Sequence, residues 1–352
     1  MRLGLTKVGF AEKLDVDRKT INRLESGDTE PSEPLMQKLV KVTKYEPHFF
    51  SGKSLEQPDA DGVSFRSMRS VTQKSRDAAI AAAAFGYALD DWVTARFNRP
   101  TSDLPDLGLA DYSAETAAMA LRMEWGIGNR PINHMINLLE SHGVRVFALA
   151  EQTRHLDAYS FWRDDTPYVF LNSGTSCERS RFDAAHELGH LVMHRKEGAR
   201  HHSAEHEANA FASAFLMPEA DVIAQVPRIS TLQSLIAQKK RWKVSVAALV
   251  YRLNKLGRMS ERQYRHFSIL LSQSGYRNDE PEPAEREQSQ IWQKVFSHLW
   301  RQGITRAHIA REIGVPESEI HNLLHGITGR APPSVDGTGM ATIRLVDNLG
   351  AI

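Results

Sequence analysis

The sequence predicts a mainly α-helical protein with a small antiparallel β-sheet, an α+β fold, and three observations support this prediction. Apolar residues recur at helical spacing through most of the chain. Strand-like runs are confined to one stretch, residues 144 to 171. Hydrophobic residues make up 41% of the 352 residues, which is ordinary for a protein with a buried core. This length predicts two or three domains.

Composition excludes several classes of protein. No apolar run approaches the roughly 20 residues that span a bilayer, and the N-terminus has no signal-peptide pattern. The single cysteine, Cys177, cannot form an intramolecular disulfide. These features predict a cytoplasmic protein without a membrane partner. Because the net charge is only +1, any surface for nucleic acid must be local.

The chain begins with the pattern of two short helices around a tight turn. Thr6 and Asp17 can cap the two helices, and Gly27 can end the second, which is helix-turn-helix spacing. Over residues 1 to 24, six basic residues stand against three acidic ones, a local charge of +3. A plain helical hairpin with solvated lysines is the alternative. If the hairpin binds DNA, the residues expected to meet it are Arg18, Lys19, Thr20 and Asn22.

The sequence of the middle region predicts a linker, three helices and three strands. The linker covers residues 51 to 62, where Gly and Pro stand among polar residues. Helices are expected over residues 71–98, 113–125 and 131–143, and strands over 144–149, 158–163 and 168–171. The edge of the sheet could pair with an extended peptide, or the sheet could simply cover the helix that follows it.

That helix carries an H-E-x-x-H motif at residues 186 to 190. His186 and His190 lie one helical turn apart on a shared face, so both imidazoles can bind one zinc ion. Glu187 flanks this face and can take a proton from a metal-activated water. Gly189 would let another segment approach closely. Alone, such a short motif also arises by chance on amphipathic helices.

A third metal ligand should come from a second helix, which ends before Pro218. Glu205 continues the buried stripe of this helix, three residues before Ala208, whereas Glu207 points away. We therefore predict Glu205 as the ligand and keep Glu207 as the runner-up. A His, His, Glu set leaves one position on zinc for water and can hydrolyse amides. Weaker candidates, expected to be exposed polar residues, are His194, His201, His202 and His206.

Beyond Pro218 the sequence predicts mainly helices, with a linker and a C-terminal tail. Residues 277–289 are rich in charge and are expected to form a linker. Residues 304–324 have the spacing of a second helix-turn-helix. The Gly/Pro-rich tail from residue 329 is expected to be flexible.

Together these motifs resemble the ImmA/IrrE family of zinc metallopeptidases. The pairing of H-E-L-G-H with E-x-E-A-N-x-F-A-x-x-x-L-M-P at residues 205–218 is specific to that family. Residues 10–27 resemble an Xre-type, or lambda-repressor-like, helix-turn-helix. The resemblance implies a cytoplasmic bacterial or phage protein with a thermolysin-like site. Its ligands would be His186, His190 and Glu205, and its general base Glu187.

The resemblance also implies a regulatory role. Family members cleave Xre-type DNA-binding repressors and so release stress, mobile-element or prophage genes. We therefore expect such a repressor as substrate and DNA as a partner of the N-terminal domain, and we leave a homodimer open. One alternative is a transcriptional regulator whose metal domain is a sensor, and another is a toxin–antitoxin component. Glu187 favours the peptidase, because a sensor needs no general base.

These interpretations predict four regions. Residues 1–52 would form the Xre-type domain, lacking its first helix because only five residues precede Thr6. Residues 53–110 would hold the linker and an alanine-rich helix. Residues 111–276 would form the zincin-like peptidase domain. Residues 277–352 would form a helical C-terminal region with the second helix-turn-helix and the flexible tail.

Overall fold

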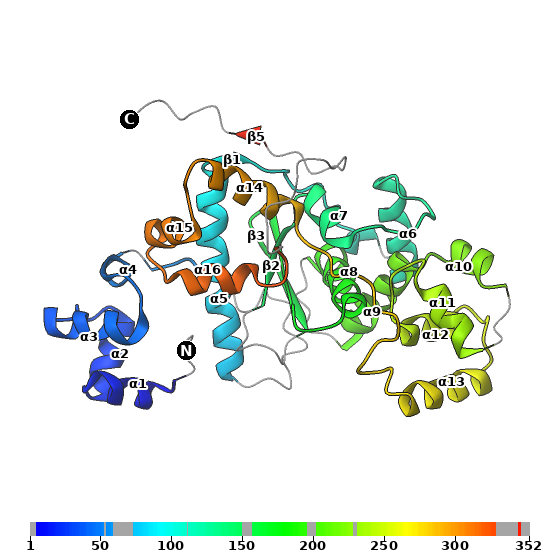
Figure 1. Ribbon diagram of the computed structural model, residues 1–352, viewed down its shortest axis with the longest axis horizontal. Coiled ribbons are helices and arrows are strands. Elements are labelled where there is room, and N and C mark those ends of the chain that lie inside the picture. The colour runs from blue at the N-terminus through cyan, green and yellow to red at the C-terminus, as the bar shows by residue number, and fades with distance from the viewer. Residues whose placement is uncertain are drawn as a thin grey trace.

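The computed structural model describes residues 5–52, 54–58, 73–110, 112–149, 157–195, 202–227, 231–328 and 344–345. Predictions for residues 1–4, for much of the 51–62 linker and for most of the tail lie outside the described residues. Helices α1 to α3 form one end of the molecule and α10 to α13 the other, with the three-stranded sheet and helices α8 and α9 between them (Figure 1). None of the described helices is long and apolar enough to cross a membrane.

The N-terminal domain consists of α1 (Lys7–Leu14), α2 (Arg18–Ser26), α3 (Glu33–Thr43) and α4 (Pro47–Ser51). The predicted caps are confirmed. Thr6 accepts a hydrogen bond from the Gly9 N–H at 3.1 Å, and Asp17 accepts one from the Thr20 N–H at 2.6 Å. Gly27 ends α2 with a φ of 74°. The domain has a small core of its own, formed by Ala11, Leu14, Ile21 and Leu39.

This domain docks on the C-terminal region through the residues around α4. Helix α5 (Gln73–Thr94) packs against α15 (Arg306–Ile313) and α16 (Glu317–Leu324). The Tyr45 hydroxyl donates to Glu319 Oε1 at 3.1 Å. Gly314 has a φ of 85°, which favours glycine, and a Cβ atom there would lie 2.5 Å from His48 Nε2, so a side chain would displace this ring. The two helices predicted within 304–324 are confirmed, but α16 lies against α5 and the sheet rather than in solvent.

The α+β class is confirmed, but the sheet is mixed rather than wholly antiparallel. Its strands are β2 (Arg145–Ala148), β3 (Ala158–Arg163) and β4 (Thr166–Leu171), in the order β2-β4-β3. β3 and β4 form an antiparallel hairpin, whereas β2 joins the other edge of β4 in the parallel direction. Most positions of the three strands are buried, so apolar and polar residues do not alternate along them. The sequence therefore does not indicate whether neighbouring strands are parallel or antiparallel. A second, two-stranded pair joins β1 (Phe97–Asn98) to β5 (Arg344–Leu345).

The remaining helices complete the fold. Among them, α8 and α9 form the closest pair, and a Cβ atom at Gly189 would lie 3.0 Å from the ring of Phe211. The predicted close approach at this glycine is therefore confirmed. These elements are η2 (Gly108–Ala110), α6 (Ala114–Glu124), α7 (Met135–Ser141), α8 (Cys177–Met193), α9 (His202–Leu216), α10 (Glu219–Gln225), α11 (Leu232–Lys239), α12 (Val246–Lys255), α13 (Glu261–Gln273) and α14 (Gln290–Arg301).

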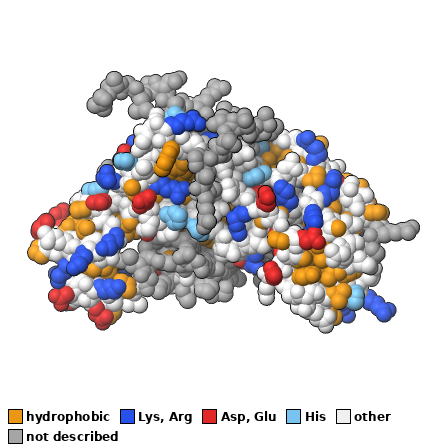
Figure 2. All heavy atoms as spheres, in the orientation of Figure 1, with side chains coloured by type: hydrophobic (Ala, Val, Ile, Leu, Met, Phe, Trp, Pro, Cys, Tyr) orange, Lys and Arg blue, Asp and Glu red, His pale blue; other side chains and the backbone are white. Residues whose placement is uncertain are grey.

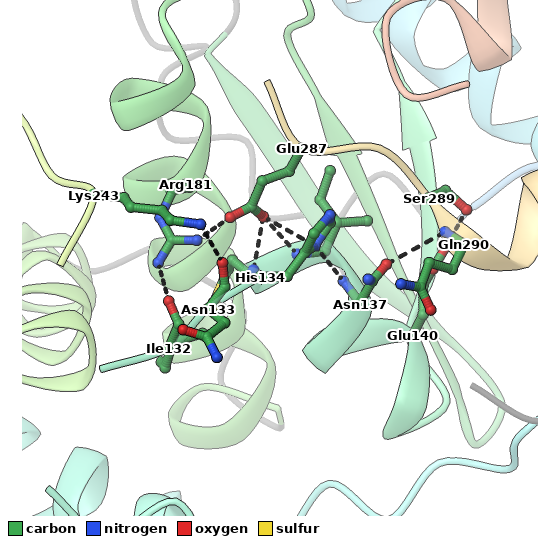
Figure 3. A network of polar contacts seen from close by, with 12 residues as sticks. Ile132, Asn133, His134, Asn137, Glu140, Arg181, Lys243, Glu287, Ser289 and Gln290 are labelled. Atoms are coloured by element: carbon green, nitrogen blue, oxygen red, sulfur yellow. Dashed lines mark hydrogen bonds and ion pairs between the residues drawn. The ribbon is translucent and has the colours of Figure 1, made fainter. Parts of the chain in front are cut away.

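The charge-rich stretch expected to be a linker contains a strap, residues 280–289, that crosses the first turns of α8 and is buried at Glu287 and Ser289. Glu287 pairs with Arg181 of α8, and its Oε2 accepts the Met135 and Ile136 N–H groups at 2.7 and 3.0 Å (Figure 3). Two of its charges have buried partners, since Glu287 pairs with Arg181 and Glu280 pairs with Lys239. The strap therefore fixes the start of the metal-motif helix against α7.

Candidate functional site

The structure brings His186, His190 and Glu205 together. Both histidines lie on α8, and Glu205 comes from the first turn of α9. The two Nε2 atoms are 3.0 Å apart, and Glu205 oxygens lie 3.1 Å from His186 Nε2 and 3.3 Å from His190 Nε2. Zinc with bonds of about 2.0 Å in tetrahedral geometry would separate its ligands by about 3.3 Å. The three side chains thus converge as one metal-binding set.

The charges around this set favour a cation. Burial opposes the charged form of Glu205, but hydrogen bonds from both histidines lower its pKa to about 2, so it is a carboxylate at neutral pH. Burial lowers the pKa of His190 to about 4, which leaves the neutral ring that binds metals. Burial also disfavours charge on His186, yet the carboxylates of Glu205 and Glu187 raise its pKa. The same negative groups would stabilise a metal ion there.

A further layer of side chains orients the two imidazoles. His186 Nδ1 lies 3.1 Å from Asn209 Oδ1 on α9. His190 Nδ1 lies 3.1 Å from His194 Nδ1, and His194 Nε2 lies 3.0 Å from Glu207 Oε2. His194 was expected to be exposed, and this is wrong, because its side chain is only 7% exposed. Such contacts to the second ring nitrogen are typical of metal-bound histidines.

Among the other weak candidates, His206 is exposed, as expected. His201 lies outside the described residues, and the side chain of His202 is not described. Glu207 contacts His194 rather than the metal-binding set, which agrees with the prediction that it points away from the metal.

Glu187 is buried beside the ligands and is held by the sheet. The Ser160 hydroxyl of β3 donates to Glu187 Oε2 at 2.6 Å. Burial raises the pKa of Glu187 to about 7, although the neighbouring His186 and the Ser160 hydrogen bond oppose this shift. A carboxyl group with this pKa can both accept and return a proton near neutral pH.

The predicted DNA-binding residues lie at the start of α2. Arg18, Lys19 and Asn22 are exposed, and Asn22 accepts a hydrogen bond from Lys7 Nζ at 3.4 Å. Thr20 is partly buried, and its hydroxyl donates to Asp17 Oδ1 at 2.8 Å as part of the helix cap. Lys and Arg side chains are interspersed with Asp and Glu over this end of the molecule (Figure 2). The first helical turn of α2 therefore offers a local basic surface rather than a wholly basic face.

Sequence reasoning missed Ser160, Asp183 and Asn209 at this site. Asn209 could have been found, because it lies one helical turn after Glu205 and so shares its face. Asp183 could likewise have been placed on the His186 face by its spacing. Ser160 gave no such signal, since its contact with Glu187 joins residues 27 positions apart.

The fold and the site together define a class: a helix-turn-helix protein with a metallopeptidase-type domain. Residues 139–254 match the model of the IrrE N-terminal-like domain, and residues 1–50 match a helix-turn-helix model. The chain therefore combines an ImmA/IrrE-like peptidase domain with an Xre-type helix-turn-helix domain, as its motifs predict. No curated protein matches the chain. The wider limits expected for these domains, 1–52 and 111–276, stay predictions.

Proposed function

We propose that this protein is a zinc-dependent endopeptidase that cleaves an Xre-type DNA-binding repressor and thereby derepresses stress or mobile-element genes. The observation that carries the proposal is the convergence of the partly buried His186 with the buried His190 and Glu205, beside the carboxyl group of Glu187. The domain match to the IrrE family supports it. Two imidazoles and one carboxylate are a donor set that zinc enzymes use for hydrolysis.

Different residues would hold the metal, transfer the proton and orient the ligands. Zinc, when bound by the three ligands, would polarise a peptide carbonyl and acidify water. Glu187 takes the proton from the attacking water and then delivers it to the leaving amine. Ser160 holds Oε2 of Glu187, which leaves Oε1 for this proton. Asn209 fixes the ring orientation of His186, so the ligand geometry is set before substrate arrives.

The edge of the sheet supports an extended substrate. Among the described residues, β3 pairs only with β4, so its other edge has no strand partner there, while α8 packs against β3. The Trp162 indole on β3 donates to the Leu191 carbonyl at 3.3 Å, so strand and helix lie side by side. A substrate backbone that adds to this edge would lie along α8 and pass the metal-binding set.

The proposal is tested by expressing wild type and Glu187→Gln beside neighbouring Xre-type repressors and a reporter for the repressed promoter. We expect repressor fragments and derepression with wild type only, because general base catalysis contributes about 10²- to 10⁴-fold. Zinc content should be equal in both proteins, since Glu187 is not one of the ligands. Equal derepression by both, with the repressor intact, would refute the peptidase and favour a sensor.

A further inference from the structure

One carboxylate on the site face of α8 has no role in the mechanism above. At about 100° per residue, Asp183 lies within 60° of His186, Glu187 and His190 around the helix axis. With a rise of about 1.5 Å per residue, it precedes His186 by about 4.5 Å and Glu187 by about 6 Å. Asp183 is thus on the same stripe as the metal-binding set, one turn nearer the start of α8.

Two elements border this stripe. On one side β3 runs in the same direction as α8, because Asp157 meets Arg179 and Ser160 meets Glu187 further along both elements. On the other side α9 runs antiparallel to α8, with Asn209 against His186. Asp183 therefore lies between the strand and α9, on the line that a substrate paired with β3 would follow.

The carboxylate of Asp183 has one oxygen without a hydrogen-bond donor among the described residues. Its Oδ2 atom is buried and has no hydrogen-bond donor. The nearby Arg179 hydrogen-bonds to Asp157, since its Nη2 donates to both oxygens of Asp157 at 2.8 Å. Burial, helped by the charge of Asp157, raises the pKa of Asp183 to about 7. A buried carboxylate oxygen without a donor is costly, and such groups concentrate at functional sites.

We propose that Asp183 is a specificity-determining residue that binds a lysine or arginine side chain of the substrate. The inference rests on the proposed peptidase function. An extended chain advances about 3.3 Å per residue, so the 6 Å between Asp183 and Glu187 places this basic residue about two positions from the cleaved bond. Asp183 is partly exposed, and a cationic side chain that reaches its carboxylate supplies a donor and a counter-charge beyond the charge of Arg179.

Direct binding tests the proposal without any need for turnover. The probes are N-acetyl-argininamide, its uncharged analogue N-acetyl-citrullinamide and glycinamide, titrated calorimetrically into the full chain with and without zinc. We expect wild type to bind the arginine probe about tenfold or more tightly than the citrulline probe, as a hydrogen bond between charged groups implies. Asp183→Asn should remove this preference. Asp103→Asn, which alters an exposed carboxylate paired with His142, should retain it.

Several results would overturn the inference. Equal binding of the arginine and citrulline probes, or no binding of either, would show that no cation site exists. A preference that survives in Asp183→Asn would place the site elsewhere. If glycinamide binds as tightly as the arginine probe, the site recognises a free amino terminus instead. Should Asp183→Asn not fold by circular dichroism, Asp183→Ser replaces it. An intact arginine preference without repressor cleavage would count against the proposed function alone.

Discussion

Removing the carboxylate of Glu287 should be the most damaging single change in the strap. The side chains of Arg181 and Glu287 are only 1% and 6% exposed. Glu287→Ala would leave Arg181 with two carbonyl acceptors, Ile132 at 2.9 Å and Trp242 at 3.3 Å, but with no counter-charge. Breaking a buried ion pair from one side costs about 3–5 kcal/mol. The two N–H groups at the start of α7 would lose their acceptor as well.

We therefore expect Glu287→Ala to lower the free energy of unfolding by about 4 kcal/mol. Glu287→Gln keeps an acceptor for the N–H groups but not the charge, so about half of this loss should remain. Urea unfolding gives the global value, and hydrogen exchange of α7 and the first turns of α8 gives the local one. Glu285→Ala is the matched control, since this neighbouring side chain is exposed and should change stability by less than about 0.5 kcal/mol. A loss below about 1 kcal/mol for Glu287→Ala would refute the reasoning.

Three further predictions concern the ligand set, pH and DNA. Glu205→Gln should lose zinc in equilibrium dialysis, whereas Glu207→Gln, which alters a partner of His194, should retain it; the reverse result would mean that α9 is rotated. Burial raises the pKa of Glu140 to about 7, so the folded state keeps a proton that the unfolded state releases near pH 4.5. Glu140 should therefore make the free energy of unfolding fall as pH rises between these values, by at most about 1.4 kcal/mol per pH unit, in addition to the falls from Asp183 and Glu187, whose pKa values burial also raises. Glu140→Gln should reduce the total slope in urea titrations, and an unchanged slope would assign it to the other groups. Wild type should give a salt-dependent mobility shift with the gene's upstream DNA, and replacing Arg18, Lys19 and Asn22 together with alanine should remove it. A shift that persists in this triple variant would contradict the predicted DNA contacts.

The elements that the sequence predicted correctly depend on short-range chemistry. The caps at Thr6 and Asp17 involve side chains and N–H groups three residues apart, which the sequence displays directly. The convergence of His186 and Glu205 followed from helical spacing and from one buried stripe. In each case the partner lies on the same helix or on the next one along the chain.

The features that the sequence did not reveal depend on distant partners. A charge-rich stretch is normally solvated, and nothing near Glu287 shows that Arg181, 106 residues earlier, will bury it. His194 was assigned to the surface for the same reason. The direction of β2 depends on which edge of β4 it joins, and strands buried on both faces carry no alternation to indicate this.

The strap also bears on where an autonomous folding unit begins and ends. Lys239 Nζ lies 3.0 Å from both Glu178 and Glu280, and all three side chains are buried. A fragment that stopped at residue 254 or 276 would discard Glu280 and Glu287, and the loss of Glu287 would leave the buried Arg181 without its carboxylate partner. The strap in turn ends at Ser289, whose N–H donates to the Ile327 carbonyl at 2.7 Å. We therefore expect a peptidase fragment to be more stable when it extends through residue 328.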